Sequence, residues 1–268
     1  MNIFKQFYYV FFWIKNNIWF KIKYFFEKFI RLICIWVKKA FKIDFSIPYI
    51  FKKDYIIKNS NWIRKIKAKS DYDFTINTNT EKELEWSFTM GKWIFIDIWA
   101  HIWKRSIFVA NQSRDIQVYA FEPNPESYRY LKENIKLNWL ENRVKWIAMW
   151  VWEKKWKLKF FAEKEMSTIS HFSEKWNMEI EIIDLESFIK DNKINIKDVR
   201  LIKIDTEWFE PQVFKWMINI IDKFENVKII CELLPNQTED KKIIENMQKK
   251  WFKLERIKET HNYIFSKK

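Results

Sequence analysis

The sequence predicts an α/β domain built on a mostly parallel, doubly wound sheet. Two observations predict it: short apolar runs with the length of buried strands, and helix-like runs between them, as at residues 106–111 and 128–137. Strands that alternate with helices favour right-handed crossovers, which place the strands parallel to one another. The predicted strands cover residues 94–97, 117–121, 144–147, 201–204 and 228–232.

The length of the chain allows one domain of about 180 to 220 residues and an appendage. We expect a basic, aromatic-rich helical appendage at 1–45, short strands leading into the core at 46–90, and the main domain at 91–268. Cys34 and Cys231 form no C-x-x-C motif, so neither a disulfide framework nor a zinc site is expected and a reducing cytosol is the natural compartment. The histidines are isolated in the sequence, which predicts no metal site.

Most of the positive charge lies near the N-terminus. Residues 1–69 hold 16 Lys and Arg against three Asp and Glu, which is +13 of the net +14. Lysines interleaved with aromatic and aliphatic residues between Ile3 and Ile50 predict a basic amphipathic helix. The longest uncharged run, Gln6–Ile14, is too short to cross a bilayer, which takes about 20 apolar residues, and the segment does not read as a signal peptide.

Two roles fit residues 1–45. They can lie on an anionic inner leaflet, which would make a cytoplasmic protein peripheral on the inner membrane surface. They can equally pack on the main domain with their lysines in water, and the sequence does not decide between these two roles. Nucleic acid is not expected as a partner, because aromatics mixed with lysine can stack on bases but no known nucleic-acid module is visible.

Tryptophan occurs where glycine is expected. The chain has one glycine and 17 tryptophans, whereas average usage predicts about 19 glycines in this length. Tryptophan follows a polar residue at breaks between apolar runs, as in Asn61-Trp62, Asn138-Trp139 and Lys250-Trp251, where turns and helix ends need a left-handed residue. We expect that the natural protein has glycine there, because UGA codons read as glycine in the source organism were translated as tryptophan. No such signal marks Trp13, Trp19, Trp36 and Trp86.

A strand, a tight loop and a helix follow one another at residues 94–111 and predict a cofactor site. The strand ends in Asp97, and with glycine restored the loop reads D-I-G-A-H-I-G. The first glycine lets the chain turn beneath a cofactor, and the second lets the helix begin close to it. The carboxylate can accept hydrogen bonds from an ammonium or hydroxyl group. We therefore assign cofactor binding to Asp97, Trp99, Ala100, His101 and Trp103.

A second carboxylate follows the next strand. Residues 117–121 lead into Glu122 and Pro123, and a carboxylate at this place can hold both hydroxyls of a ribose. Either carboxylate alone would be an ordinary turn residue, but together they end successive strands, so Glu122 and Pro123 join the predicted cofactor site. A dinucleotide site is excluded, because G-x-G-x-x-G would need glycine at His101 and Lys104.

These motifs resemble the FkbM family of S-adenosylmethionine-dependent methyltransferases. The resemblance covers about residues 90–235 and is most specific at Leu201–Pro211, where glycine at position 208 gives the family pattern D-x-E-G-x-E. It implies a class I, Rossmann-like methyltransferase fold with a mostly parallel seven-stranded sheet and helices on both faces. It also implies S-adenosylmethionine as cofactor and O-methylation of a hydroxyl on a sugar, a glycan or another small acceptor.

Methyl transfer to a hydroxyl needs alignment and a base, without a covalent enzyme intermediate. The candidate catalytic residues are Asp205, Glu207 and His171. Asp205 and Glu207 are preferred because the family pattern puts them at the edge of the sheet. Glu207 and Glu210 could instead fix the loop by capping the helix that starts near Pro211.

The alternative to an enzyme is a non-catalytic membrane-surface protein built on a decayed methyltransferase domain. The presence of all four strand-end carboxylates, Asp97, Glu122, Asp205 and Glu207, favours the enzyme. The chain as written should be impaired, because an indole in the cofactor loop fills room that the cofactor needs and strains a left-handed backbone. We expect a glycine-restored chain (Trp99→Gly, Trp103→Gly and Trp208→Gly) to bind S-adenosylmethionine, and the chain with tryptophan to bind it weakly or not at all.

Overall fold

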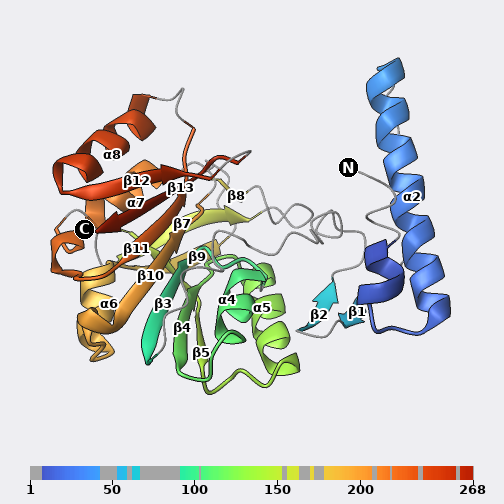
Figure 1. Cartoon of the computed structure of the whole chain (residues 1–268), viewed down its shortest axis with the longest axis horizontal. Coiled ribbons are helices and arrows are strands. Elements are labelled where there is room, and N and C mark those ends of the chain that lie inside the picture. The colour runs from blue at the N-terminus through green and yellow to red at the C-terminus, as the bar shows by residue number, and fades with distance from the viewer. Residues whose placement is uncertain are drawn as a thin grey trace. The chain divides into compact units, whose positions relative to one another are not determined.

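The first 80 residues and the rest of the chain fold as separate units. In the computed structural model these are Met1–Thr80 and Glu81–Lys268 (Figure 1). The structure describes residues 8–42, 53–58, 62–66, 91–102, 104–152, 156–162, 170–171, 178–206, 210–217, 219–234, 238–257 and 260–267.

The N-terminal unit combines a long helix with a two-stranded hairpin. Its elements are a π-helical turn η1 (Tyr9–Trp13), α2 (Ile18–Phe41), β1 (Tyr55–Lys58) and antiparallel β2 (Ile63–Ile66). Asn17 caps α2 by accepting a hydrogen bond from the Phe20 backbone N–H at 2.8 Å. The Asn16 side chain ties the start of α2 to β1, because it donates to the carbonyl of Ile56 and accepts from the N–H of Lys58. The predicted N-terminal helix is confirmed.

The inward face of α2 differs from an ordinary amphipathic stripe. Tyr24 contributes to a small core with Val10, Ile14, Tyr55 and Ile57. Glu27, Lys28 and Arg31 are also buried, and their spacing of three, four and seven residues from Tyr24 puts them on its face. Large apolar side chains lie instead on the surface, among them Trp19, Phe26 and Trp36. None of the helices in the described ranges is long and apolar enough to span a membrane.

The second unit contains a seven-stranded sheet with the strand order β12-β13-β11-β10-β3-β4-β5. Only β13 runs against the other six, since it pairs antiparallel with both of its neighbours. The strands are β3 (Trp93–Ile98), β4 (Ile116–Phe121), β5 (Val144–Ile147), β10 (Val199–Ile204), β11 (Lys228–Glu232), β12 (Phe252–Arg256) and β13 (Asn262–Lys267). The prediction of a mostly parallel, doubly wound sheet is confirmed.

Helices cover both faces of this sheet (Figure 1). On one face, Ile94, Ile96 and Ile98 of β3 pack in a single core with apolar residues of α6, α7 and α8. Because side chains alternate along a strand, Phe95 and Asp97 point to the opposite face, where α4 and α5 contact the strands. The helices are α4 (Lys104–Ala110), α5 (Pro125–Leu137), α6 (Leu185–Asp191), α7 (Glu210–Met217) and α8 (Thr238–Lys249).

A second, four-stranded sheet interrupts the α/β alternation between β5 and α6. Its order is β6-β9-β7-β8, with β6 (Met149–Val151), β7 (Trp156–Ala162), β8 (Ser170–His171) and β9 (Met178–Ile183). The sheet was not predicted. The alternation of Met178, Ile180 and Ile182 with two glutamates is the period-two signal that could have found β9.

Candidate active site

The carboxyl ends of four parallel strands form one rim of the main sheet. The register pairs Ile98 with both Phe121 and Ile204, and Ile204 with Cys231. The next residue along each strand therefore lies at the rim, and these residues are Trp99, Glu122, Asp205 and Glu232. The chain winds away from β3 and β10 in opposite directions, and ligands of such sheets bind in the crevice outside this switch point.

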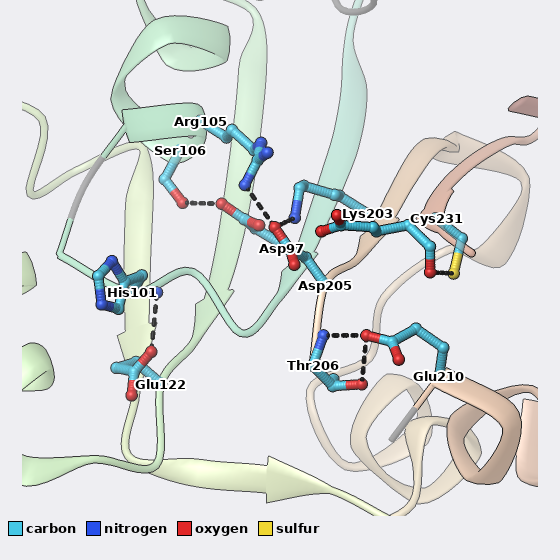
Figure 2. A network of polar contacts seen from close by, with 11 residues as sticks. Asp97, His101, Arg105, Ser106, Glu122, Lys203, Asp205, Thr206, Glu210 and Cys231 are labelled. Atoms are coloured by element: carbon cyan, nitrogen blue, oxygen red, sulfur yellow. Dashed lines mark hydrogen bonds and ion pairs between the residues drawn. The ribbon is translucent and has the colours of Figure 1, made fainter. Parts of the chain in front are cut away.

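Asp97 is a fully buried carboxylate at the end of β3. Its side chain is 0% exposed, and the Ser106 hydroxyl of α4 donates to Oδ2 at 2.6 Å (Figure 2). Oδ1 has no hydrogen-bond partner among the described residues. Burial raises the pKa of Asp97, although the positive charge of Lys203 opposes the shift. A buried acceptor without a donor is unfavourable unless a ligand supplies one.

The loop after β3 lies across the strand ends and is tied to β4. Trp99 and His101 both have left-handed backbones, with φ of 70° and 59°. The Ala100 N–H donates to the carbonyl of Phe121 at 2.8 Å, and the His101 N–H donates to Oε2 of Glu122 at 2.7 Å. Trp103, the remaining predicted loop residue, lies outside the described residues.

Glu122 connects this loop to the start of α5. It is 1% exposed, and its Oε1 accepts a hydrogen bond from the Asn124 N–H at 2.8 Å while Oε2 accepts from His101. Pro123 is buried between Glu122 and Asn124, and the Asn124 side chain caps α5. Burial raises the pKa of Glu122 to about 8. Asp97 and Glu122 thus flank the loop, as predicted.

Asp205 is held by two cations. Its Oδ2 accepts hydrogen bonds from Lys203 Nζ at 2.6 Å and from Arg105 Nη1 at 2.8 Å, and the Lys203 side chain is only 1% exposed (Figure 2). Burial by itself would raise the pKa of Asp205, but Lys203 and Arg105 hold it well below its usual range. Because Asp205 stays ionised, it is a poor acceptor of protons. It is therefore better suited to act as a fixed negative charge than as the predicted general base.

No contact among the described residues places the other two predicted catalytic residues, Glu207 and His171, at the rim. Glu207 lies outside the described residues; His171 pairs through its backbone with Phe161 in β7, and its side chain is not described. Glu210 does fix the loop, because its Oε1 accepts from the backbone N–H and the hydroxyl of Thr206 at 2.7 and 3.1 Å.

Glu232 is the rim carboxylate that was missed. It ends β11 and its side chain is exposed. The sequence contains the pattern that could have identified Glu232, because this residue ends the predicted strand 228–232 just as Asp97 ends the predicted strand 94–97. No group of His, Cys, Asp and Glu able to hold a metal ion occurs within the described ranges.

Three tryptophans occupy left-handed positions, as expected where glycine is required. Trp99, Trp139 and Trp251 have φ of 70°, 55° and 66°, and tryptophan supplies three of the six described non-glycine residues with positive φ. Gly91, the single glycine, has φ of 106°. At the rim the Trp99 ring contacts Trp150 at 4.9 Å between centroids. Large side chains are rare in this conformation, so these positions favour glycine.

The strand order, the switch-point loop and the two flanking carboxylates define a class I methyltransferase domain. Residues 74–207, half of the chain, match the model of the TRM5/TYW2 methyltransferase domain, and the chain belongs to this family. The resemblance to the FkbM family is therefore wrong at the level of the family. The segment that carried it, Leu201–Pro211, includes Thr206 and Glu210, whose contacts serve to shape a loop, and such a role does not identify one family.

Several known proteins are similar to this chain. The tRNA(Phe) (4-demethylwyosine(37)-C(7)) aminocarboxypropyltransferase of Methanocaldococcus jannaschii is 44% identical over 55 residues, which are 20% of this chain and 22% of that protein. The structure of M. jannaschii TYW2 in complex with AdoMet is 17% identical, with a TM-score of 0.40 over 82% of this chain and 87% of that one. An FkbM methyltransferase from Methylobacillus flagellatus KT is 12% identical, with a TM-score of 0.46 over 67% and 44%.

Proposed function

We propose that this protein binds S-adenosylmethionine beside the loop after β3 and transfers a group from it to a base of tRNA. The observation that carries the cofactor assignment is the pair of buried carboxylates, Asp97 and Glu122, at the ends of neighbouring strands. Asp97 Oδ1 still lacks a donor among the described residues, and the cofactor offers ammonium and hydroxyl donors. The donor set of the ligand thus fits the acceptors of the site.

The residues of the chain bind and orient the cofactor. In this proposal Asp97 accepts hydrogen bonds from the ammonium group and Glu122 accepts them from the ribose hydroxyls, while the hydrogen bond between Glu122 and His101 ties the loop to β4. Arg105 and Lys203 fix the negative charge of Asp205 at the rim. Once bound, S-adenosylmethionine supplies an electrophilic carbon attached to a sulfonium sulfur.

A tRNA acceptor replaces the small hydroxyl compound expected from the sequence. It is supported by the family to which the chain belongs and by the tRNA-directed activity named for the M. jannaschii relative. The charge of +13 in residues 1–69 suits a polyanionic partner, since phosphate contacts dominate nucleic-acid affinity. Nucleic acid, ranked last from the sequence, thus becomes the preferred partner, and nothing in the family assignment supports sugar O-methylation. A cytoplasmic location and membrane contact of residues 1–45 stay predictions.

Two groups can be transferred from this cofactor, and labelled cofactor distinguishes them. The glycine-restored chain is incubated with an unmodified tRNA(Phe) transcript, with tRNA(Phe) that carries 4-demethylwyosine at position 37, the acceptor named for the relative, or with bulk tRNA. S-adenosylmethionine is labelled in the methyl or in the carboxyl carbon. Methyl label in the RNA means methyl transfer, and carboxyl label means transfer of the aminocarboxypropyl group. A chain that binds the cofactor but labels no RNA contradicts the proposed acceptor. Label in an oligosaccharide, supplied in place of the RNA, would indicate a sugar acceptor instead. Binding without any transfer would leave the non-catalytic alternative.

Cofactor affinity should rise with pH because of Glu122. Ribose hydroxyls donate to the ionised carboxylate, whereas the free site holds a proton below its pKa of about 8. Binding must then release that proton, so affinity falls by up to about tenfold for each pH unit below about 8 and is constant above it. Calorimetry of the glycine-restored chain with methylthioadenosine, which has the ribose but no amino group, checks this. An affinity that is flat or falls between about pH 6 and about pH 8 contradicts it.

A further inference from the structure

Glu232 lies next to Asp205 at the rim, and the proposed binding of the cofactor does not use it. In the parallel pair β10 and β11, Ile204 lies opposite Cys231, so the residues that follow them are neighbours. Cys231 belongs to the core under α6, α7 and α8, and the alternation of side chains therefore turns Glu232 to the face of α4. Arg105 of α4 reaches Asp205 on the same face.

Glu232 is also the rim carboxylate that a substrate can reach. Asp97 and Glu122 are 0% and 1% exposed, and the side chain of Asp205 is 15% exposed and carries two cations. Glu232 is exposed. Of the rim carboxylates in the described ranges, it is thus the one with both solvent access and proximity to the switch point.

The surroundings of Glu232 favour proton uptake. Burial of part of the side chain, followed by the negative charge of Asp205, raises the pKa of Glu232, while the positive charges of Lys203 and Arg105 oppose the shift. On the other side of β11, β13 places Asn262 opposite Glu232, and His261 precedes it. Once protonated, Glu232 can donate to Asp205, which its two cations keep ionised.

We propose that Glu232 is the general base that accepts the proton lost by the acceptor atom, an inference that rests on the proposed group transfer. The acceptor atom forms a bond to the transferred carbon, and the bond from that carbon to sulfur breaks, with its electrons left on sulfur. The proton of the acceptor atom passes to a Glu232 oxygen and from there to solvent. Asp205 acts as a positioning residue that receives the hydrogen bond of protonated Glu232.

Replacing Glu232 by Gln tests the role in the glycine-restored full chain, with the tRNA(Phe) transcript as probe. Loss of a general base typically costs about 100-fold or more in kcat, and we expect that loss with cofactor affinity unchanged. The acidic limb of the kcat–pH profile should vanish, and Glu232→Asp should retain part of the activity and that limb. Glu239→Gln, which alters an exposed ion pair with Lys242, is the control and should change nothing. A kcat for Glu232→Gln within about threefold of the parent overturns the proposal.

Titration of Glu232 separates this proposal from the choice of acceptor. Carbon-13 NMR of side-chain carboxyl groups in the full chain, with Glu232→Gln to assign the signal, needs no RNA. A pKa above that of an ordinary glutamate supports the pair with Asp205, and an ordinary or lowered pKa overturns the proposal. If the parent chain labels no RNA, the proposed acceptor fails, and the titration alone decides whether Glu232 is poised to take up a proton.

Discussion

The glycine-restored chain should bind S-adenosylmethionine at least about tenfold more tightly than the chain with tryptophan. Trp99 is 7% exposed and sits at the rim with φ of 70°. Its ring contacts Trp150, and ring contacts continue through Trp152 to Trp216, so indoles fill space beside the strand ends. Glycine at position 99 removes one indole and relieves a left-handed backbone that costs a bulky residue about 1 to 2 kcal/mol. Calorimetry with the cofactor measures the gain.

Trp139→Gly is the matched control for this gain. Trp139 has φ of 55° and is 80% exposed just after α5, at the end of that helix remote from the rim. The change should stabilise the fold and leave cofactor affinity unaltered. Equal affinities of the glycine-restored chain and its parent would contradict the loop assignment. UGG codons at positions 99, 103 and 208 in the gene would refute the recoding by which we explain the tryptophans.

Asp205→Asn should destabilise the fold by about 3 kcal/mol or more, because loss of one partner of a buried ion pair leaves the other charge buried and unpaired. Lys203 is 1% exposed, and its Nζ lies 2.6 Å from the Asp205 carboxylate. Asn keeps the shape of the side chain but removes the charge that Lys203 and Arg105 share. Urea unfolding of the full chain, monitored by circular dichroism, measures the loss.

Glu225→Gln provides the comparison for Asp205→Asn. It breaks a pair of similar length, Lys197 with Glu225 at 2.7 Å, whose side chains are 64% and 54% exposed. Exposed pairs contribute little, because water solvates both charges whether or not they meet. If Asp205→Asn lowers the stability by no more than Glu225→Gln does, the explanation from the burial of Lys203 is wrong.

The parallel strands were predictable because each contains a short, mostly apolar run bounded by polar residues. A run such as Ile94–Asp97 must be buried on both faces, and its terminal carboxylate then falls at the rim with Glu122. The left-handed positions of Trp99, Trp139 and Trp251 were predictable for a similar local reason, since breaks between apolar runs require a turn. In each case the information lies within a few consecutive residues.

The ion pairs of the site were not predictable, because they join residues distant in the sequence. Arg105 and Asp205 meet only once α4 packs on the face of β3 and β10, and Glu232 gains its neighbour only through the register of β10 and β11. Lys203 falls within the predicted strand 201–204, and no pattern in the sequence indicates that its side chain is buried. The family was misread for a related reason, since the motif at Leu201–Pro211 describes a loop geometry more than an acceptor.

Cofactor binding between Asp97 and Glu122 is the central claim, and one calorimetric comparison tests it most directly. S-adenosylmethionine is titrated into the glycine-restored chain, into the same chain with Asp97→Asn, and into the same chain with Asp115→Asn at an exposed turn. An amide in place of the carboxylate removes the charge that faces the ammonium group, so Asp97→Asn should weaken binding by about tenfold or more. Asp115→Asn should leave it unchanged. Equal affinities of all three chains would contradict the account.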